Sequence, residues 1–323
     1  MMTQNGSRPF TLVGRIHREA PALDALIAPG TVIEKLADGF VWTEGPVWIA
    51  EGDYLLFSDV PGNKMYRWSE HEGVSVFLDP SGYDGPAPSA FREPGSNGLI
   101  RGPAGTILMC DHGNRAVASL ELHTKRRTFL ATHFEGKRFN SPNDLALAST
   151  GAIYFTDPPY GLLGLDASPL KEQPHNGVYR LDPDGAVTLL DASLSFPNGI
   201  LLSPDERILY VAISDPERPV WIRYSLDAAG LISDSSLFAD ASAEVAQGLP
   251  GLPDGMTIDR HGNLFATGPG GVHILAPDGT RIGRIDTGQA IANCTFGEDG
   301  STLFLASTDM IARLPTLTGG LGS

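Results

Sequence analysis

Residues 198–225 read NGILLSPDERILYVAISDPERPVWIRYS, and this segment shows the pattern from which the fold can be predicted. It contains three short runs rich in Ile, Leu, Val and Tyr, and turn-forming residues such as Ser203-Pro-Asp205 lie between them. Apolar runs of this length between turn residues are typical of antiparallel strands joined by tight hairpins. The stretch therefore predicts a meander of strands that begins at Asn198.

The same arrangement recurs along the chain. A polar residue opens the first run of each copy, and we call these residues the anchors: Glu44, Asn97, Asn143, Asn198, Asp254 and Asn293. Successive anchors are 53, 46, 55, 56 and 39 residues apart. Four-stranded units of about this length are typical of a β-propeller. Six copies predict an all-β fold, a six-bladed β-propeller.

The ends of the repeat region indicate how the ring closes. A strand-like segment, Thr31–Leu36, precedes the first blade, and the sixth repeat ends after its third run, near Leu314. We expect the early strand to complete the last blade, which hides sheet edges that would otherwise pair with other chains. The predicted domains are an N-terminal extension over residues 1–29 and a single propeller over residues 30–323.

Two proline-rich stretches interrupt the repeats and are predicted as inserted loops, Asp79–Pro94 and Pro158–Pro174. Long loops in a compact domain are usually functional or disordered. Tyr160, His175 and Asn176 flank the second loop and are candidates for a lid over the channel.

The composition excludes several classes of protein. With 23 basic and 38 acidic residues, the net charge is −15, which disfavours nucleic acids and anionic membranes as partners. No apolar stretch approaches the roughly 18 residues that a membrane span needs. The two cysteines, Cys110 and Cys294, are far apart and are expected to be buried free thiols. With no secretory signal recognised, we expect a cytoplasmic protein.

The anchors carry the candidate chemistry. The first strand of every propeller blade lines the central channel, so six side chains with an oxygen acceptor are expected to converge there. Two are carboxylates and four are amides, a set that suits a hard divalent cation such as Ca²⁺. Zn²⁺ or copper would call for imidazole or thiolate. The alternative is that Asn-Gly and Asp-Gly pairs merely form turns.

Several motifs, in the right order, resemble those of the gluconolactonase/regucalcin (senescence marker protein) family. The motifs are Glu44-Gly-Pro-Val-Trp48, Ser141-Pro-Asn-Asp-Leu145, Phe196-Pro-Asn-Gly-Ile200, Pro253-Asp-Gly-Met256 and Asn293-Cys-Thr-Phe296. The segment Tyr154–Gly161 is similar to the bacterial gluconolactonase branch. The resemblance covers about residues 30–315. It implies a six-bladed propeller with a catalytic divalent metal, usually Ca²⁺, in the central channel.

The resemblance also implies roles for individual residues. Glu44, Asn198 and Asp254 would hold the metal, and Asn143 would contribute to the metal or the substrate. Mg²⁺, Mn²⁺ and Zn²⁺ are alternative ions. Some relatives carry an arginine two residues before the third-blade asparagine, where this chain has Ser141. Arg138 lies three residues earlier and is a candidate substrate contact.

The expected reaction is hydrolysis of a sugar lactone, most simply glucono-1,5-lactone, with a metal-polarised carbonyl attacked by water. Asp254 is the expected general base, because it would touch both metal and solvent. Asn97 and Asn143 are expected to orient substrate hydroxyls or water, and His112 is a further substrate-binding candidate. The alternatives are hydrolysis of phosphotriesters, as in fluorophosphatases, or of other lactones on the same metal, and a non-enzymatic calcium-binding propeller. The oligomeric state stays open.

Overall fold

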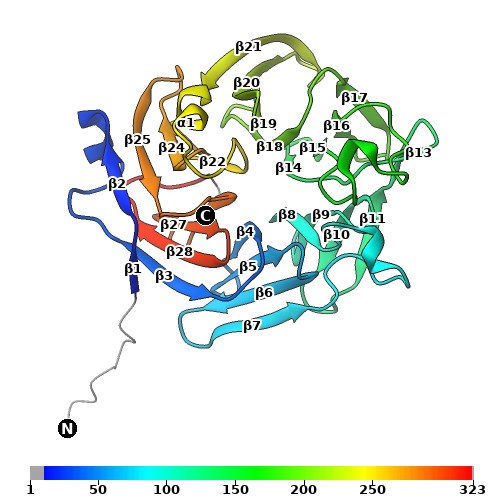
Figure 1. The fold of residues 1–323 in the computed structure, drawn as a ribbon, viewed down its shortest axis with the longest axis horizontal. Coiled ribbons are helices and arrows are strands. Elements are labelled where there is room, and N and C mark those ends of the chain that lie inside the picture. Colours follow the sequence, from blue (N-terminus) through cyan, green and yellow to red (C-terminus); the bar gives the residue numbers. More distant parts are fainter. Residues whose placement is uncertain (1–10, 322–323) are drawn as a thin grey trace.

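Six antiparallel sheets surround a central channel in the computed structural model, which describes residues 11–321 (Figure 1). Each sheet is one blade, and its first strand is the innermost, so the six-bladed propeller predicted from the repeats is confirmed. Blade one contains β4 (Thr43–Ile49), β5 (Tyr54–Asp59), β6 (Lys64–Ser69) and β7 (Gly73–Leu78). Blade two contains β8 (Ser96–Arg101), β9 (Thr106–Asp111), β10 (Ala116–Glu121) and β11 (Arg127–Ala131). Blade three contains β14 (Leu145–Leu147), β15 (Ile153–Asp157), β16 (Gly177–Leu181) and β17 (Val187–Asp191).

The remaining blades follow the same order from the channel outward. Blade four contains β18 (Pro197–Leu202), β19 (Ile208–Asp215), β20 (Arg218–Leu226) and β21 (Ile232–Asp240). Blade five contains β22 (Met256–Ile258), β23 (Leu264–Gly268), β24 (Gly271–Leu275) and β25 (Arg281–Asp286). Blade six contains β26 (Asn293–Gly297), β27 (Thr302–Ser307) and β28 (Met310–Pro315). Blade six needs a fourth strand, which comes from the other end of the chain.

That strand is β3 (Ile33–Asp38), which pairs with β28 in antiparallel register, Met310 opposite Asp38. The closure expected from Thr31–Leu36 is therefore confirmed, with the strand shifted by two residues. Two further short strands add to outer edges: β1 (Thr11–Val13) pairs with β3, and β2 (Arg15–Arg18) pairs with β25 of blade five. Within the segment expected as an N-terminal extension, residues 11–29 thus lie against the propeller, and residues 1–10 lie outside the described residues.

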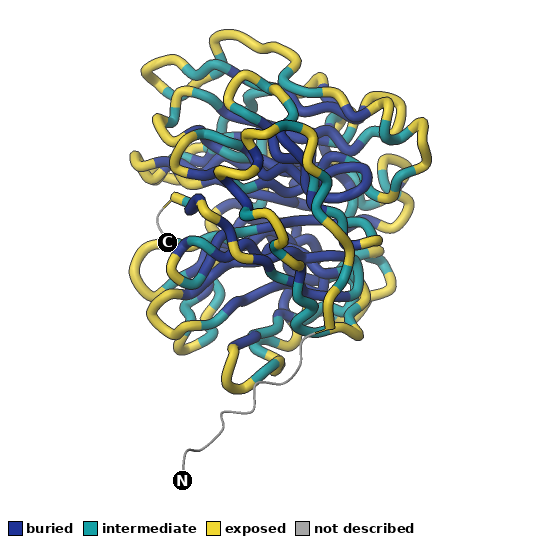
Figure 2. The backbone as a smooth tube through the Cα atoms, turned by 90° about the vertical axis from the view of Figure 1, so that its left-hand side faces the viewer, coloured by how far each residue is buried: buried dark blue, intermediate teal, exposed yellow. Residues whose placement is uncertain are grey.

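The core is divided among the six junctions between neighbouring blades. Each hydrophobic cluster joins two adjacent sheets. At the junction that closes the ring, Trp48 of blade one stacks on Phe304 of blade six with ring centroids 5.4 Å apart, and Trp68 packs against the same ring. Figure 2 shows the buried residues running through the middle of the molecule, while the connecting loops are exposed.

Short elements occupy the connections between strands. They are η1 (Pro21–Ala25), η2 (Pro88–Ala90), η3 (Leu165–Ala167), α1 (Ser242–Ala246) and the hairpin of β12 (His133–Phe134) and β13 (Lys137–Arg138). In the part of the chain that the structure describes, no helix is long and apolar enough to cross a membrane. Cys110 and Cys294 are buried and free, as the sequence predicted.

The closing junction offers a test of how the ring is stabilised. Replacing the fully buried Phe304 with alanine should lower the free energy of unfolding by about 3–5 kcal/mol, because it removes an aromatic ring that two tryptophans contact. Urea denaturation measures the loss. The control Leu237→Ala, on the exposed outer strand of blade four, should change it by less than about 0.5 kcal/mol. Equal effects of the two substitutions would contradict this account.

Candidate functional site

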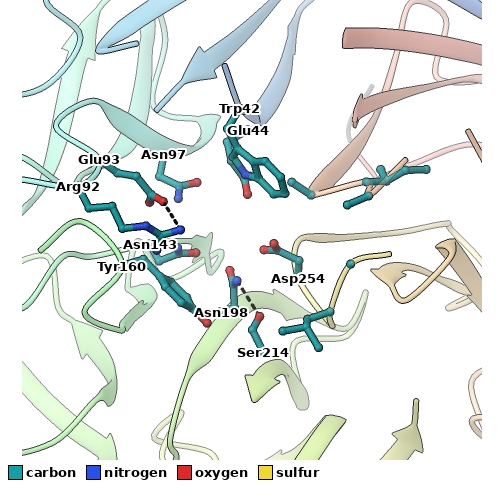
Figure 3. Close-up of a pocket in the computed structure, with 15 residues that line it drawn as sticks. Trp42, Glu44, Arg92, Glu93, Asn97, Asn143, Tyr160, Asn198, Ser214 and Asp254 are labelled. Carbon is teal, nitrogen blue, oxygen red and sulfur yellow. Dashed lines mark hydrogen bonds and ion pairs between the residues drawn. The ribbon is translucent and has the colours of Figure 1, made fainter. Parts of the chain in front are cut away.

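A cavity of about 370 Å³ opens at the end of the channel where the inner strands begin (Figure 3). Five of the six anchors line it, and its wall consists of Trp42, Glu44, Arg92, Glu93, Asn97, Asn143, Tyr160, Asn198, Ser214, Gly251, Leu252, Asp254, Ala290, Ile291 and Ala292. The sixth anchor, Asn293, lies behind Glu44 and donates a hydrogen bond from Nδ2 to its Oε2 at 3.3 Å. The six anchors, which the sequence repeat identifies, therefore lie at or next to one cavity.

The anchors sit where the strand ladder is irregular. Regular pairing is interrupted between Glu44 and Val47, between Ser96 and Leu99, and between Pro197 and Ile200. Such bulges re-aim a side chain, and here they direct the anchors of blades one, two and four toward the channel. These three anchors therefore lie in bulged strands and do not serve as turn residues.

The glycine that follows an anchor is needed because the next blade comes very close. A Cβ atom on Gly199 would lie 2.2 Å from the carbonyl oxygen of Asp254, and one on Gly45 would lie 2.2 Å from that of Asn97. A Cβ atom on Gly98 would lie 2.8 Å from the carbonyl oxygen of Asn143, and one on Gly255 would lie 2.1 Å from the side chain of Asn293. Glycine after the anchor thus lets neighbouring inner strands meet at backbone distance.

Hydroxyl groups at the ends of the second strands hold these close strands together. Ser58 donates from Oγ to the carbonyl oxygen of Asn97 at 2.9 Å, and Thr156 donates from Oγ1 to that of Asn198 at 2.6 Å. Ser214 donates to Pro253 O, directly before Asp254. Each hydroxyl therefore fixes the position of an anchor in the following blade.

Aspartates that follow two of these hydroxyl residues hold the loops that precede anchors in their own blades. Asp157 accepts the backbone N–H groups of Asn140 and Ser141 at 2.7 and 2.8 Å. Asp59 accepts those of Val41 and Trp42 at 3.2 and 3.1 Å. Burial raises the pKa of Asp157 to about 7. In each of these two Ser/Thr-Asp pairs, the hydroxyl group thus positions the anchor of the following blade, and the aspartate carboxylate positions the anchor of its own blade.

The side chain of Asn198 has one defined orientation. Its Nδ2 donates to Ser214 Oγ at 2.9 Å, which leaves Oδ1 directed away from that partner (Figure 3). Oδ1 is buried and has no hydrogen-bond partner. A buried acceptor without a partner costs about 1–3 kcal/mol, so this atom points to a donor or a cation that the protein itself does not supply.

Two carboxylates face this orphaned oxygen across the cavity (Figure 3). Burial raises the pKa of Glu44 to about 8, and the charge of Asp144 adds to the shift. Burial and the charge of Glu44 raise the pKa of Asp254 well above its usual range. Asp144, next to Asn143, is itself buried, which raises its pKa to about 7. The site therefore gathers carboxyl groups whose charged forms are disfavoured by burial and, for Glu44 and Asp254, by neighbouring carboxylates.

The donor set fits a hard cation. In the described residues, no three His, Cys, Asp or Glu side chains are grouped in a way that could hold a metal ion. A site that combines carboxylate with amide oxygens is of the kind that Ca²⁺ accepts. Glu44, Asn198 and Asp254, with Asn143 beside them, present such oxygens to the cavity.

His112 contacts an anchor from behind rather than lining the cavity. It is fully buried, and its Nε2 lies 3.2 Å from Asn97 Nδ2. Its Nδ1 lies 3.4 Å from Glu93 Oε2. The structure thus brings His112 to the site but places Asn97 between it and the cavity.

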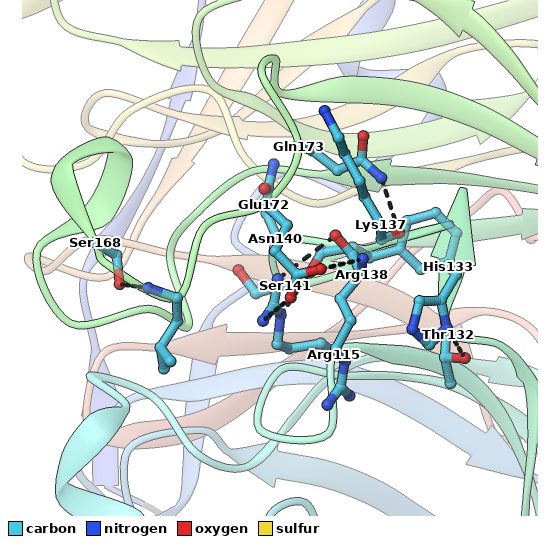
Figure 4. Close-up of polar contacts among 12 residues, drawn as sticks. Arg115, Thr132, His133, Lys137, Arg138, Asn140, Ser141, Ser168, Glu172 and Gln173 are labelled. Atoms are coloured by element: carbon cyan, nitrogen blue, oxygen red, sulfur yellow. Dashed lines mark hydrogen bonds and ion pairs between the residues drawn. The ribbon is translucent and has the colours of Figure 1, made fainter. Parts of the chain in front are cut away.

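Arg138 lies elsewhere (Figure 4). It belongs to the β13 hairpin, its Nη2 donates to the carbonyl oxygen of Asn114, and its backbone N–H donates to Glu172 at 3.0 Å. It is not among the residues that line the cavity, because these contacts keep its guanidinium at the outer hairpin. The arginine of the cavity wall is instead Arg92, which the sequence analysis missed.

The two inserted loops supply the remaining polar wall. Arg92 and Glu93 come from the first loop and Tyr160 from the second, whereas the other lid candidates, His175 and Asn176, do not line the cavity. Nothing in the repeat pattern marks Arg92 or Glu93, because they lie outside it. Ser214 had a signal that could have been used, since Ser214-Asp215 repeats the pattern of Ser58-Asp59 and Thr156-Asp157.

Comparisons with known proteins place this geometry in context. A family model described as the SMP-30/gluconolactonase/LRE-like region matches residues 42–309. The chain is 50% identical over 313 residues to a gluconolactonase of Zymomonas mobilis, covering 95% of this chain and 88% of that protein. A solved gluconolactonase of Xanthomonas campestris has a TM-score of 0.80 at 31% identity, covering 96% of this chain and 99% of that one. A regucalcin of Agrobacterium tumefaciens, 19% identical with a TM-score of 0.68 over 88% of this chain and 94% of that one, shares the fold.

The close approach at Gly199 can be tested directly. Gly199→Ala should lower the free energy of unfolding by about 1–3 kcal/mol and reduce catalytic activity, since the new methyl group pushes the Asp254 backbone away. Gly185→Ala is the control: this turn glycine has a φ of +90° but open space around it, so it tests backbone strain alone. Gly185→Ala should lower the free energy of unfolding by about 1–2 kcal/mol and leave catalytic activity unchanged. Full activity in Gly199→Ala, by a lactone hydrolysis assay, would refute the packing argument.

Proposed function

Because the chain belongs to the SMP-30/gluconolactonase/LRE-like family and is a lactone hydrolase, we propose that its substrate is a sugar lactone of the glucono-1,5-lactone type. The product would be the corresponding aldonic acid. We also propose that a divalent cation at the anchors assists the reaction. The observation that carries the metal proposal is the buried Asn198 Oδ1, which has no partner and faces two carboxylates.

The residues that would hold the cation are Glu44, Asn198 and Asp254, with Asn143 as a further ligand or substrate contact. Their all-oxygen chemistry supports Ca²⁺, with Mg²⁺, Mn²⁺ and Zn²⁺ as alternatives. When bound, such a cation supplies Lewis-acid polarisation of a carbonyl oxygen. Asn293 and Ser214 would keep the Glu44 and Asn198 side chains oriented, because each already holds its partner by a hydrogen bond.

The chain's own residues account for the proton movements. Hydrolysis adds one water: a bond forms between the water oxygen and the carbonyl carbon, and the bond from that carbon to the ring oxygen breaks. Asp254 would accept the proton of the attacking water, since its carboxylate lines the cavity beside the other anchors. The proton then goes to the ring oxygen as it leaves. Asn97 and Asn143, which line the same cavity, would orient the substrate's hydroxyl groups.

The proposed setting is the cytoplasm. Cys110 and Cys294 are both buried free thiols, which suits a reducing compartment. The partner proposed is the small-molecule lactone.

The first experiment measures proton release from D-glucono-1,5-lactone after the protein is stripped with a chelator and then reloaded with Ca²⁺. Spontaneous hydrolysis is subtracted. We expect turnover that disappears with the chelator and returns with Ca²⁺. Activity that is unaffected by thorough metal removal would overturn the metal proposal. No turnover, with Ca²⁺ still raising the melting temperature, would overturn the sugar-lactone proposal and leave other lactones and phosphotriesters as substrates to try.

A conservative substitution separates the role of Asp254 from a merely structural one. Asp254→Asn keeps the volume but removes the charge and the basic oxygen, so turnover should fall by about 10²–10⁴-fold and Ca²⁺ binding should weaken at the same time. Calorimetric titration with Ca²⁺ and the lactone assay measure the two effects. Asp240→Asn, at the end of the outer strand of blade four, is the matched control. Near-normal turnover in Asp254→Asn would show that another group takes the proton.

A further inference from the structure

The two inserted loops meet above the cavity. Phe91 of the first loop and Leu162 of the second form an isolated antiparallel bridge. The backbone N–H groups of Arg92 and Glu93 both donate to the carbonyl oxygen of Gly161, at 3.0 and 3.4 Å. This junction places Arg92, Glu93 and Tyr160 side by side on the cavity wall (Figure 3).

The junction is held at several points. The N–H of Tyr83 donates to Pro94 O at 2.8 Å, and the Tyr83 ring packs on Phe91 with centroids 4.7 Å apart. On the other side, a Cβ atom on Gly161 would lie 2.8 Å from the Cβ atoms of His112 and Ser141. Fixed backbone of this kind pre-organises the side chains it carries, which is a requirement for selective recognition.

Glu93 is the carboxylate that this junction adds to the cavity wall. Its side chain is only 12% exposed, and both its oxygens have a neighbour: Oε1 lies 3.3 Å from Arg92 Nη2, and Oε2 lies 3.4 Å from His112 Nδ1. A carboxylate has about four acceptor positions, so one neighbour on each oxygen leaves acceptors free. Those acceptors belong to a cavity whose wall also contains the anchor amides and the aromatic rings of Trp42 and Tyr160.

The arrangement suits a neutral ligand with several hydroxyl groups. An anionic ligand would be repelled by the carboxylates of Glu44, Glu93 and Asp254. Hydroxyl groups, in contrast, donate to a carboxylate in strong, charge-assisted hydrogen bonds. Among the described residues that line the cavity, Arg92 is the only one with a basic side chain, and it can donate hydrogen bonds to hydroxyl oxygens. The flat aromatic walls would contact the less polar faces of a ring.

We infer that Glu93, flanked by Arg92 and His112, is the residue by which this site recognises the hydroxyl groups of its lactone. The loop junction fixes the backbone of Glu93, and its carboxylate distinguishes a polyhydroxylated lactone from the same ring without hydroxyls. This assignment rests on the proposed function for its substrate class. It adds a specificity-determining residue that lies outside the anchor ring and outside the repeats.

The test compares two lactones of the same ring size, D-glucono-1,5-lactone and the unsubstituted δ-valerolactone. Glu93→Gln should raise KM for the sugar lactone by about tenfold, since a neutral amide replaces charge-assisted acceptors. Its kcat for the sugar lactone and its kcat/KM for δ-valerolactone should stay close to those of the unmodified protein. Glu72→Gln, whose side chain is 65% exposed, is the control and should change neither substrate. The melting temperature of each variant checks that it folds.

A binding measurement keeps this inference separate from the proposed reaction. Calorimetry compares D-glucono-1,5-lactam, which resists hydrolysis, with the unsubstituted δ-valerolactam. Selective loss of sugar-lactam affinity in Glu93→Gln would support the inference even if the unmodified protein hydrolysed no sugar lactone, a result that would defeat only the proposed function. In the kinetic comparison, equal losses of kcat/KM for D-glucono-1,5-lactone and δ-valerolactone would show that Glu93 acts on site geometry through His112 and Asn97, and would overturn the inference. It would also be overturned if Glu93→Gln changed neither ligand, or if the unmodified protein failed to bind the sugar lactam.

Discussion

The inner strands of neighbouring blades approach each other closely at one end of the channel, and this packing shapes both the ring and the site. At Gly45 and Gly199 the next blade's carbonyl oxygen occupies the place of a side chain. Hydroxyl groups such as those of Ser58 and Thr156 then bond across the junction. The same contacts that let six sheets close into a ring therefore bring the anchor side chains together, so fold closure and site formation have one physical cause.

The ring also creates an electrostatic imbalance that the fold does not relieve. Glu44, Asp144 and Asp254 are buried, and the pKa of each is raised because burial disfavours the charged form. The adjacent amide oxygen of Asn198 has no donor. Polar groups in a structural role are normally paired, so this unpaired acceptor, beside buried carboxyl groups, indicates a site organised to bind a further group. The aromatic and apolar junctions between blades supply the stability that such a site costs.

The loops add a second level of organisation to the repeat. The anchors come from equivalent positions in successive blades, whereas Arg92, Glu93 and Tyr160 come from insertions that only two connections carry. A bridge between Phe91 and Leu162 joins these insertions. The repeat thus provides chemistry that is common to one end of a ring, and the insertions make one side of the cavity different from the other, which is what recognition of an asymmetric ligand requires.

The six-bladed ring, the strand that closes it and the anchors could be predicted from the repeats, because strand runs, turns and anchors recur at equivalent positions. The position of Glu44, Asn198 and Asp254 at one end of the channel followed as well, because equivalent positions in a closed ring converge. The polar wall, in contrast, depends on the packing of loops from different blades. Arg92 and Glu93 have no periodic signal, while Arg138, close to an anchor in sequence, is held at an outer hairpin by Asn114 and Glu172. Contacts between insertions depend on how loops from different blades pack, and local pattern carries no record of that.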